Sequence, residues 1–270
     1  MKVGVGAESI AEERRVALTP DGVKSIRAKG FEAIVQSGAG APAGFSDAAY
    51  REAGAELIGT LGEVFRSSDI VLRVMGPSDE AASSEADLLR PGSALIGFLF
   101  PGVNPATVVT LKQRRVSAFA MELIPRITRA QSMDALSSMS TVAGYKGALL
   151  AAELLPKFFP MLMTAAGTLT AARVLVIGAG VAGLQAIATC KRLGAVVEAF
   201  DVRPAVKEQV ESLGARFVEM HAQIDDAEDA GGYAKEVSGT SHTLELELIA
   251  SRLPKNDVVI ATALIPGKRA

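Results

Sequence analysis

The chain has 270 residues, enough for two domains with a core in each. Its composition is 49 % hydrophobic but only 5 % aromatic, with no tryptophan, which predicts cores filled by aliphatic side chains. A net charge of −2 gives no reason to expect a nucleic-acid partner. The single cysteine, Cys190, excludes an intramolecular disulfide, and we expect a small packed residue there rather than a catalytic thiol.

The sequence predicts neither a membrane span nor a signal peptide. No uninterrupted apolar run reaches the roughly 18 to 20 residues that a membrane span needs. The richest apolar segment, 148–166, is broken by Pro156 and Pro160 and by charged residues. The first five residues read as a strand that starts at once. We therefore expect a soluble intracellular protein with no direct membrane insertion, so that any association with a membrane would come through a partner.

Residues 1–135 alternate between strand and helix patterns. This alternation predicts an α/β fold whose parallel sheet is covered by helices on both faces, so the segment is expected to form an N-terminal α/β domain. Thr19 followed by Pro20 marks one helix start, because threonine caps helices and proline is tolerated in the first turn. The expected strands are 2–6, 32–36, 69–74, 94–99 and 117–121, and the expected helices are 20–30, 47–54, 61–67, 78–89 and 105–114.

A polar loop at 125–136 ends this first domain. It carries Arg126, Gln131 and Asp134 within a few residues and then passes into a long apolar helix. Two interpretations of the loop stay open, a binding site or a solvated connector before a capped helix. Residues 136–165 are expected to form a linking helix and a hinge between the domains.

The segment 173–201 organises the second half of the chain. An apolar, β-branched strand at 173–177 runs into a glycine-rich turn, a helix pattern follows at 181–193, and a second apolar strand at 196–200 is followed by Asp201. The turn reads Gly178-Ala179-Gly180-Val181-Ala182-Gly183. This context of strand, turn, helix, strand and acid is what G-x-G-x-x-G requires before it indicates dinucleotide binding. A glycine-rich turn that binds nothing is the weaker interpretation.

Each residue type in the turn has a physical role. Gly178 allows the sharp bend, Gly180 lets the backbone approach a pyrophosphate, and Gly183 lets the helix lie close to the strand. The helix start offers N–H groups and a partial positive charge to phosphates. A carboxylate at Asp201 would bond a ribose 2′-hydroxyl and repel a 2′-phosphate, which favours NAD over NADP. Arg203 complicates this preference, because an arginine can also accommodate a 2′-phosphate.

Residues 166–270 are expected to form a Rossmann domain that is incomplete at its C-terminus. Beyond the fingerprint, the pattern predicts a helix at 204–213, a strand at 216–220, a helix at 240–253 and a strand at 257–261. Only four strands are readable in a fold that normally has six. The polar stretch 221–239 is expected to be a functional loop. The two histidines lie far from any cysteine, so no metal site is expected.

Several motifs resemble the alanine dehydrogenase and pyridine nucleotide transhydrogenase family, and the resemblance covers essentially the whole chain. The shared motifs lie at 15–20, 126–138, 164–168 and 173–203. The transhydrogenase branch is the more similar, through RAQSMD at 129–134, GVAGLQA at 180–186, AGGYAKE at 230–236 and TALIPGK at 262–268.

The resemblance implies a peripheral component of a proton-translocating NAD(P) transhydrogenase. It would hold NAD(H) while an NADP(H)-binding domain docks against it, and hydride would pass directly between the two nicotinamides. A membrane domain would couple this transfer to proton movement, and the component would be a homodimer. This chemistry needs orientation and a dry site rather than a protein nucleophile, metal or acid–base pair.

The resemblance also implies roles by position. Arg126, Gln131 and Asp134 match the polar loop that positions the nicotinamide end, with Ser137 nearby. Leu264 borders the cofactor after the last expected strand. The remaining matches are Gly178, Ala179, Gly180, Val181 and Gly183 at the pyrophosphate, Asp201, Val202 and Arg203 at the adenosine, and Gly232 and Tyr233 in a loop that closes over the nucleotide.

Two departures from the family pattern keep alternatives open. The family's domain is longer, so the chain could be a non-catalytic NAD-binding module. The alanine dehydrogenase branch uses an arginine, a lysine and a histidine on the first domain. Here Arg15 is present, but Arg73 stands where the lysine is expected and Phe100 lies near the histidine position. An amino-acid oxidoreductase is therefore the disfavoured alternative.

Overall fold

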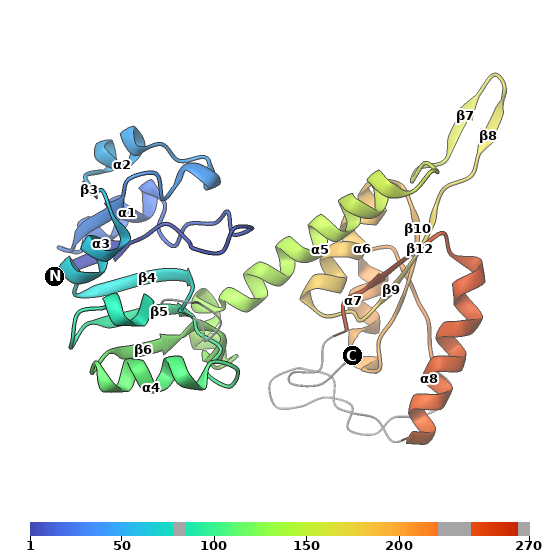
Figure 1. Cartoon of the computed structure of the whole chain (residues 1–270). Coiled ribbons are helices and arrows are strands. Elements are labelled where there is room, and N and C mark those ends of the chain that lie inside the picture. The colour runs from blue at the N-terminus through green and yellow to red at the C-terminus, as the bar shows by residue number, and fades with distance from the viewer. Residues whose placement is uncertain (78–84, 221–238, 264–270) are drawn as a thin grey trace. The chain divides into compact units, whose positions relative to one another are not determined.

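The computed structural model describes residues 1–77, 85–220 and 239–263. The chain divides into two compact units, Met1–Asp134 and Ala135–Ala270. Both are α/β units with parallel sheets, as the sequence predicts, and Figure 1 shows their elements. No helix in the described ranges has both the length and the apolar character needed to cross a membrane.

The first unit is built on a parallel sheet of six strands in the order β3–β2–β1–β4–β5–β6. Each strand pairs in parallel with its neighbour, and the chain crosses over between them, which makes the sheet doubly wound. The strands are β1 Lys2–Val5, β2 Glu32–Gln36, β3 Glu56–Ile58, β4 Ile70–Met75, β5 Ala94–Phe98 and β6 Ser117–Ala120.

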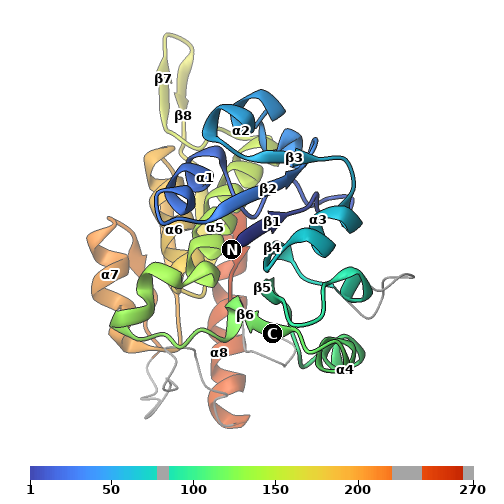
Figure 2. The ribbon, with the colours of Figure 1, turned by 90° about the vertical axis from the view of Figure 1, so that its left-hand side faces the viewer.

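Helices cover both faces of this sheet because both faces are apolar. On β2, Ala33 and Val35 join one buried cluster with α1 and α2, whereas Ile34 joins the other cluster with α3 and α4. Figure 2 shows α1 on one side of the strands and α3 and α4 on the other. The helices are α1 Pro20–Arg27, α2 Asp47–Ala53, α3 Leu61–Ser67 and α4 Pro105–Gln113. Thr19, Ser46 and Thr60 cap the first three with their hydroxyl groups.

Two parts of the first unit differ from the sequence expectation. β3 was not predicted, because it has only three residues and none of them is buried. A helix was predicted over 78–89, but the described part forms only the 3-10 turn Glu85–Leu88, and 78–84 lie outside the described residues.

The second unit has a parallel sheet of four strands in the order β11–β10–β9–β12. α5 packs along α6 so closely that a Cβ on Gly144 would overlap the carbonyl oxygen of Ala182. α8 lies on the other side of the sheet from α5 and α6 (Figure 1). The elements are β9 Arg173–Ile177, β10 Val196–Phe200, β11 Arg216–Phe217, β12 Val258–Ala261, α5 Ala135–Leu154, α6 Val181–Arg192, α7 Lys207–Ser212 and α8 Gly239–Arg252.

A hairpin lies where the sequence predicted a hinge. β7 Leu162–Thr164 pairs antiparallel with β8 Gly167–Leu169. Thr164 closes the turn, since its hydroxyl donates to the carbonyl of Gly167 and accepts from the N–H of Ala166, each over 3.2 Å. The hairpin was missed because its strands are three residues long and carry no buried side chain.

Candidate functional site

The glycine turn follows β9 in the second unit, as the motif predicts. Gly178 has a φ of +91°, which favours glycine, and a Cβ there would lie 2.8 Å from the backbone nitrogen of Ala263. A Cβ on Gly183 would overlap the carbonyl oxygen of Gly178. These two glycines let β9 turn sharply and let α6 rest on the turn.

Gly180 differs from the other two glycines because a Cβ there would meet no backbone atom and would overlap nothing. The nearest atom to a Cβ placed on it is Nη2 of Arg203, at 3.9 Å. Gly180 is also the N-cap of α6, and it offers no side chain to cap the helix start. Val181 in the first turn is 41 % exposed. The turn therefore has room for a pyrophosphate at the positive end of the α6 dipole.

Asp201 follows β10 and points back at the turn. Its Oδ2 accepts a hydrogen bond from the N–H of Ala179 over 2.7 Å. Its Oδ1 accepts from the backbone N–H and from Nε of Arg203, both over 2.9 Å, and Nη2 of Arg203 donates to Oδ2 over 2.9 Å. The structure thus brings the predicted acid, arginine and turn together. Val202 lies half-buried between the acid and the arginine.

The strand order places this turn at the switch point of the sheet. β9 pairs with β10 on one side and with β12 on the other, so the chain reverses direction across the sheet at β9. In open α/β sheets, ligands bind outside the carboxyl ends of the strands at such a point. The turn and the helix start can therefore receive the phosphates of a nucleotide, with the carboxylate of Asp201 beside them.

The polar loop of the first unit contains the 3-10 turn Thr128–Met133, and another 3-10 turn, Met121–Leu123, comes just before the loop. Within it, Nε of Arg126 lies 4.0 Å from Oδ2 of Asp134, and both side chains are partly exposed. The N–H of Asp134 donates to the carbonyl of Gln131, whose side chain is exposed. Ser137 lies in the first turn of α5, in the second unit. Gly232, Tyr233 and Leu264 lie outside the described residues.

Arg73 is buried inside the first unit, where its side chain bonds other residues of the protein. Its side chain is 1 % exposed, and its guanidinium lies 3.5 Å from a carboxylate oxygen of Glu8 and 3.1 Å from one of Glu85. It also donates to the carbonyl of Ala7 over 2.6 Å and to the hydroxyl of Ser9 over 3.0 Å. The arginine is therefore committed to the protein itself.

Glu8 was not singled out from the sequence. Its carboxylate accepts hydrogen bonds from the N–H groups of Val74, over 2.8 Å, and Met75, over 3.1 Å. Burial raises the pKa of Glu8, although Arg73 and these two N–H groups oppose the rise. No sequence signal pointed to Glu8, because its partners lie 66 and 67 residues away.

Arg15 and Phe100, at the other two positions that alanine dehydrogenases use, also bond residues of the protein itself. Arg15 pairs with Glu13 through Nε at 2.8 Å and Nη2 at 2.6 Å. Phe100 has a φ of +45°, and the carboxylate of Glu122 accepts its N–H over 2.5 Å and that of Leu99 over 3.1 Å. A phenyl ring on this strained turn cannot act as a proton acceptor.

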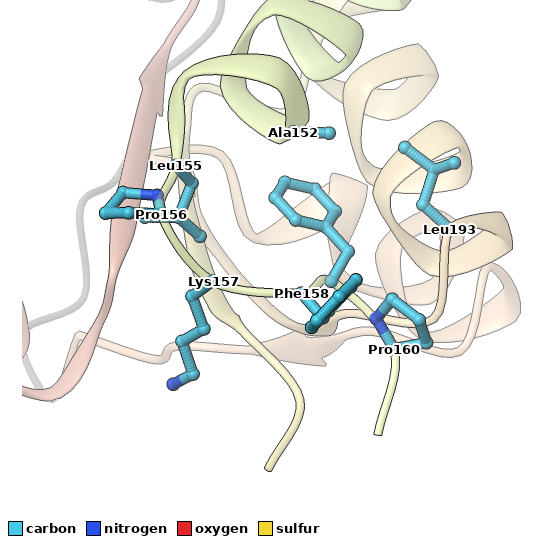
Figure 3. Close-up of a pocket in the computed structure, with 8 residues that line it drawn as sticks. Ala152, Leu155, Pro156, Lys157, Phe158, Pro160 and Leu193 are labelled. Atoms are coloured by element: carbon cyan, nitrogen blue, oxygen red, sulfur yellow. The ribbon is translucent and has the colours of Figure 1, made fainter. Parts of the chain in front are cut away.

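An apolar cavity of about 450 Å³ lies elsewhere in the second unit (Figure 3). Its one charged lining residue, Lys157, donates to Oδ2 of Asp257 over 2.7 Å, and the same oxygen accepts the N–H of Arg173 at the start of β9. The cavity thus lies at the amino edge of the sheet, away from the glycine turn. The lining residues are Ala152, Leu155, Pro156, Lys157, Phe158, Phe159, Pro160 and Leu193.

Thiol and metal chemistry find no support in the described part of the chain. Burial raises the pKa of Cys190 to about 11, so the thiol stays protonated at neutral pH. Among the residues that the structure describes, no three His, Cys, Asp or Glu side chains are grouped to hold a metal ion.

Comparison with known proteins identifies relatives over the full length of the chain. The family models for the N-terminal and C-terminal domains of alanine dehydrogenase/PNT match residues 4–143 and 147–270. The first of the polypeptides that make up NAD(P) transhydrogenase subunit alpha in Rhodospirillum rubrum is 47 % identical over 272 residues, which are 100 % of this chain and 71 % of that protein. NAD(P) transhydrogenase subunit alpha of Haemophilus influenzae is 45 % identical, and the match covers 100 % of this chain and 51 % of that protein.

Among solved structures, the transhydrogenase from Sinorhizobium meliloti superposes with a TM-score of 0.85 at 41 % sequence identity. The match covers 100 % of this chain and 72 % of that one. The chain therefore spans only a portion of the length of each of these relatives.

Proposed function

Because the chain belongs to the alanine dehydrogenase and pyridine nucleotide transhydrogenase family, we propose that it is the NAD(H)-binding component of a proton-translocating NAD(P) transhydrogenase. The observation that carries the proposal is the carboxylate of Asp201, which is bonded to Ala179 in a glycine turn whose middle glycine is open. That arrangement suits an NAD adenosine ribose and disfavours a 2′-phosphate.

Direct hydride transfer between two nicotinamides requires the protein to bind and orient its nucleotide. When bound, NAD(H) supplies the hydride chemistry, and the chain supplies binding, orientation and exclusion of water. Ala179, Val181 and the rest of the glycine turn would hold the pyrophosphate, and Val202 and Arg203 would border the adenosine. Arg126, Gln131, Asp134 and Ser137 would orient the nicotinamide, with Gly232, Tyr233 and Leu264 closing the site.

The partners proposed for this component are an NADP(H)-binding domain and a membrane domain. They would place the chain at the inner face of the cytoplasmic membrane. The names of two relatives support these partners, since one relative is an alpha subunit of an NAD(P) transhydrogenase and the other is a portion of such a subunit. Mixing the protein with an NADP(H)-binding component should give hydride transfer from NADH to an NADP analogue. Alanine oxidation without that partner would contradict the proposal.

The engagement of Arg73 argues against the amino-acid alternative. Two carboxylates, a carbonyl and a hydroxyl already surround its guanidinium, so it has no capacity to bind a substrate carboxylate. Phe100 offers no group to accept a proton. An amino acid would therefore find no available guanidinium at Arg73 and no base at Phe100.

Replacing Asp201 with alanine should weaken NADH binding by about 1–3 kcal/mol, because the site loses its carboxylate and the N–H of Ala179 in the glycine turn loses its acceptor. The affinity for NADPH should fall less or rise, since Arg203 would no longer be neutralised by the carboxylate. Titration of nucleotide fluorescence measures both constants. Glu208→Ala, which removes an exposed carboxylate from α7, is the matched control and should bind NADH like the wild type. Unchanged NADH affinity in Asp201→Ala would remove this residue from the site.

We further propose that the protein is a homodimer in which hairpin β7–β8 contacts a second copy. The hairpin exposes apolar side chains, with Met163 at 78 % and Leu169 at 48 % exposed. Two-stranded hairpins are marginally stable in water unless another surface covers them. A second copy would supply that cover at each hairpin of a twofold dimer.

Met163→Asp should convert a dimer to monomers in sedimentation velocity, because it would bury a charge in the interface. Gln209→Asp on α7 adds the same charge at an exposed position outside the hairpin and should leave the dimer intact. A wild-type protein that sediments as a monomer at micromolar concentration would refute the homodimer.

A further inference from the structure

We propose that Thr262 is a positioning residue of the dinucleotide site, which holds the glycine turn in its binding conformation. The inference rests on the proposed function, because it concerns the same turn. Thr262 follows β12, and its N–H donates to the carbonyl of Ile177, the last residue of β9, over 2.8 Å. Its hydroxyl donates to the carbonyl of Gly178 over 2.8 Å and lies 3.4 Å from that of Ile177.

The peptide group between Gly178 and Ala179 is thereby held at both ends. Its C=O accepts from Thr262, and its N–H donates to Asp201 over 2.7 Å. One partner comes from the end of β12 and the other from the end of β10, on opposite sides of β9. The two side chains thus fix one peptide plane across the switch point.

The orientation of this peptide matters because it sets the turn. Gly178 has a φ of +91°, a region where glycine is free to move to other conformations. A Cβ on Gly183 would lie 2.9 Å from Oγ1 of Thr262, so hydroxyl, carbonyl and α6 backbone meet at one point. Rotation of the peptide would withdraw the N–H of Ala179 from Asp201 and turn the carbonyl away from Thr262.

If the glycine turn also adopts other conformations, the apparent affinity for NADH falls in proportion to the fraction of molecules whose turn keeps the binding conformation. Thr262→Val keeps the shape of the side chain and removes the hydroxyl. We expect it to raise the Kd for NADH by about tenfold, because the carbonyl of Gly178 loses its partner. Thr262→Ser keeps the hydroxyl and should bind within about twofold of the wild type.

The experiment is an NADH fluorescence titration of the purified wild type, Thr262→Val and Thr262→Ser, with thermal unfolding of each in parallel. Rescue by serine identifies the hydroxyl as the cause and separates it from loss of packing. Combining Thr262→Val with Asp201→Ala should give less than the sum of the two effects on binding, since the two changes remove both partners of the same peptide group.

Two results would overturn the role of Thr262. One is a Thr262→Val variant that binds NADH as tightly as the wild type, whether or not it is less stable. The other is a serine variant that binds as weakly as the valine variant. A wild-type protein that binds no NADH would instead refute the proposed function, so the two failures are distinguishable.

Discussion

Gly183→Ala should destabilise the second unit and abolish NADH binding. The added Cβ would overlap the carbonyl oxygen of Gly178 and would lie 2.9 Å from the hydroxyl of Thr262. A backbone oxygen cannot move aside as a flexible side chain can, so α6 must shift away from β9. We expect a loss of about 3 kcal/mol or more in the free energy of unfolding, at the upper end of overpacking effects. Thermal unfolding followed by circular dichroism measures it.

Gly180→Ala is the matched control for this prediction. A Cβ on Gly180 meets no atom closer than 3.9 Å, and its φ of −74° suits any residue. The variant should therefore unfold like the wild type and yet bind NADH more weakly, because the methyl group occupies the space of the pyrophosphate. If Gly183→Ala kept both its stability and its affinity, the close packing of α6 on the turn would not be required.

The sequence predicted the second unit well because its signals are local. The fingerprint, helix and acid lie within about 30 consecutive residues, and each has a recognisable type. β10 was predicted with its observed bounds, and α6 ends one residue before its predicted end. The succession of strand and helix patterns in the first unit likewise predicted β2 and α3 with their observed bounds, since each buries side chains in a core.

The roles of Thr262 and Glu8 could not be predicted from the sequence, because they depend on contacts between distant segments. Thr262 bonds a carbonyl 84 residues earlier, and Glu8 bonds N–H groups 66 and 67 residues later. Thr262 opens the TALIPGK motif and Glu8 lies in none, but the bonding partners of both residues become evident only when the strand order brings the segments together. The roles of Arg126, Gln131 and Asp134 in nicotinamide binding stay predictions, because they concern contacts with a bound ligand.

Arg73→Met should destabilise the first unit by about 3–5 kcal/mol, the usual range when one partner of a buried ion pair is removed. The side chains of Arg73 and Glu8 are 1 % and 2 % exposed, and that of Glu85 is 12 % exposed. Without the guanidinium, both carboxylates would stay buried and would lose the ion-pair partner that they share. Unfolding in guanidinium chloride, followed by circular dichroism, measures the loss.

The stability that Arg73→Met loses should depend on pH, and the protonation of Glu8 determines the direction of that dependence. Burial already raises the pKa of Glu8 in the folded protein, and Arg73 is the strongest influence that lowers it. Arg73→Met should therefore raise this folded-state pKa further above the unfolded value. A raised folded-state pKa means that the folded form binds the proton more tightly. The stability linked to that proton is complete below the unfolded pKa and is lost as the pH rises through the folded pKa.

Arg73→Met should accordingly be less destabilised at about pH 5 than at about pH 7. Replacing Glu8 with glutamine in the same variant should restore some of the lost stability and reduce the difference between the two pH values, because glutamine does not ionise. The single variant Glu8→Gln shows how much the free energy of unfolding changes when the carboxylate alone is lost. An equal loss at both pH values would mean that Glu8 is not the group whose charge Arg73 stabilises, and that the arginine acts through its hydrogen bonds to Ala7 and Ser9.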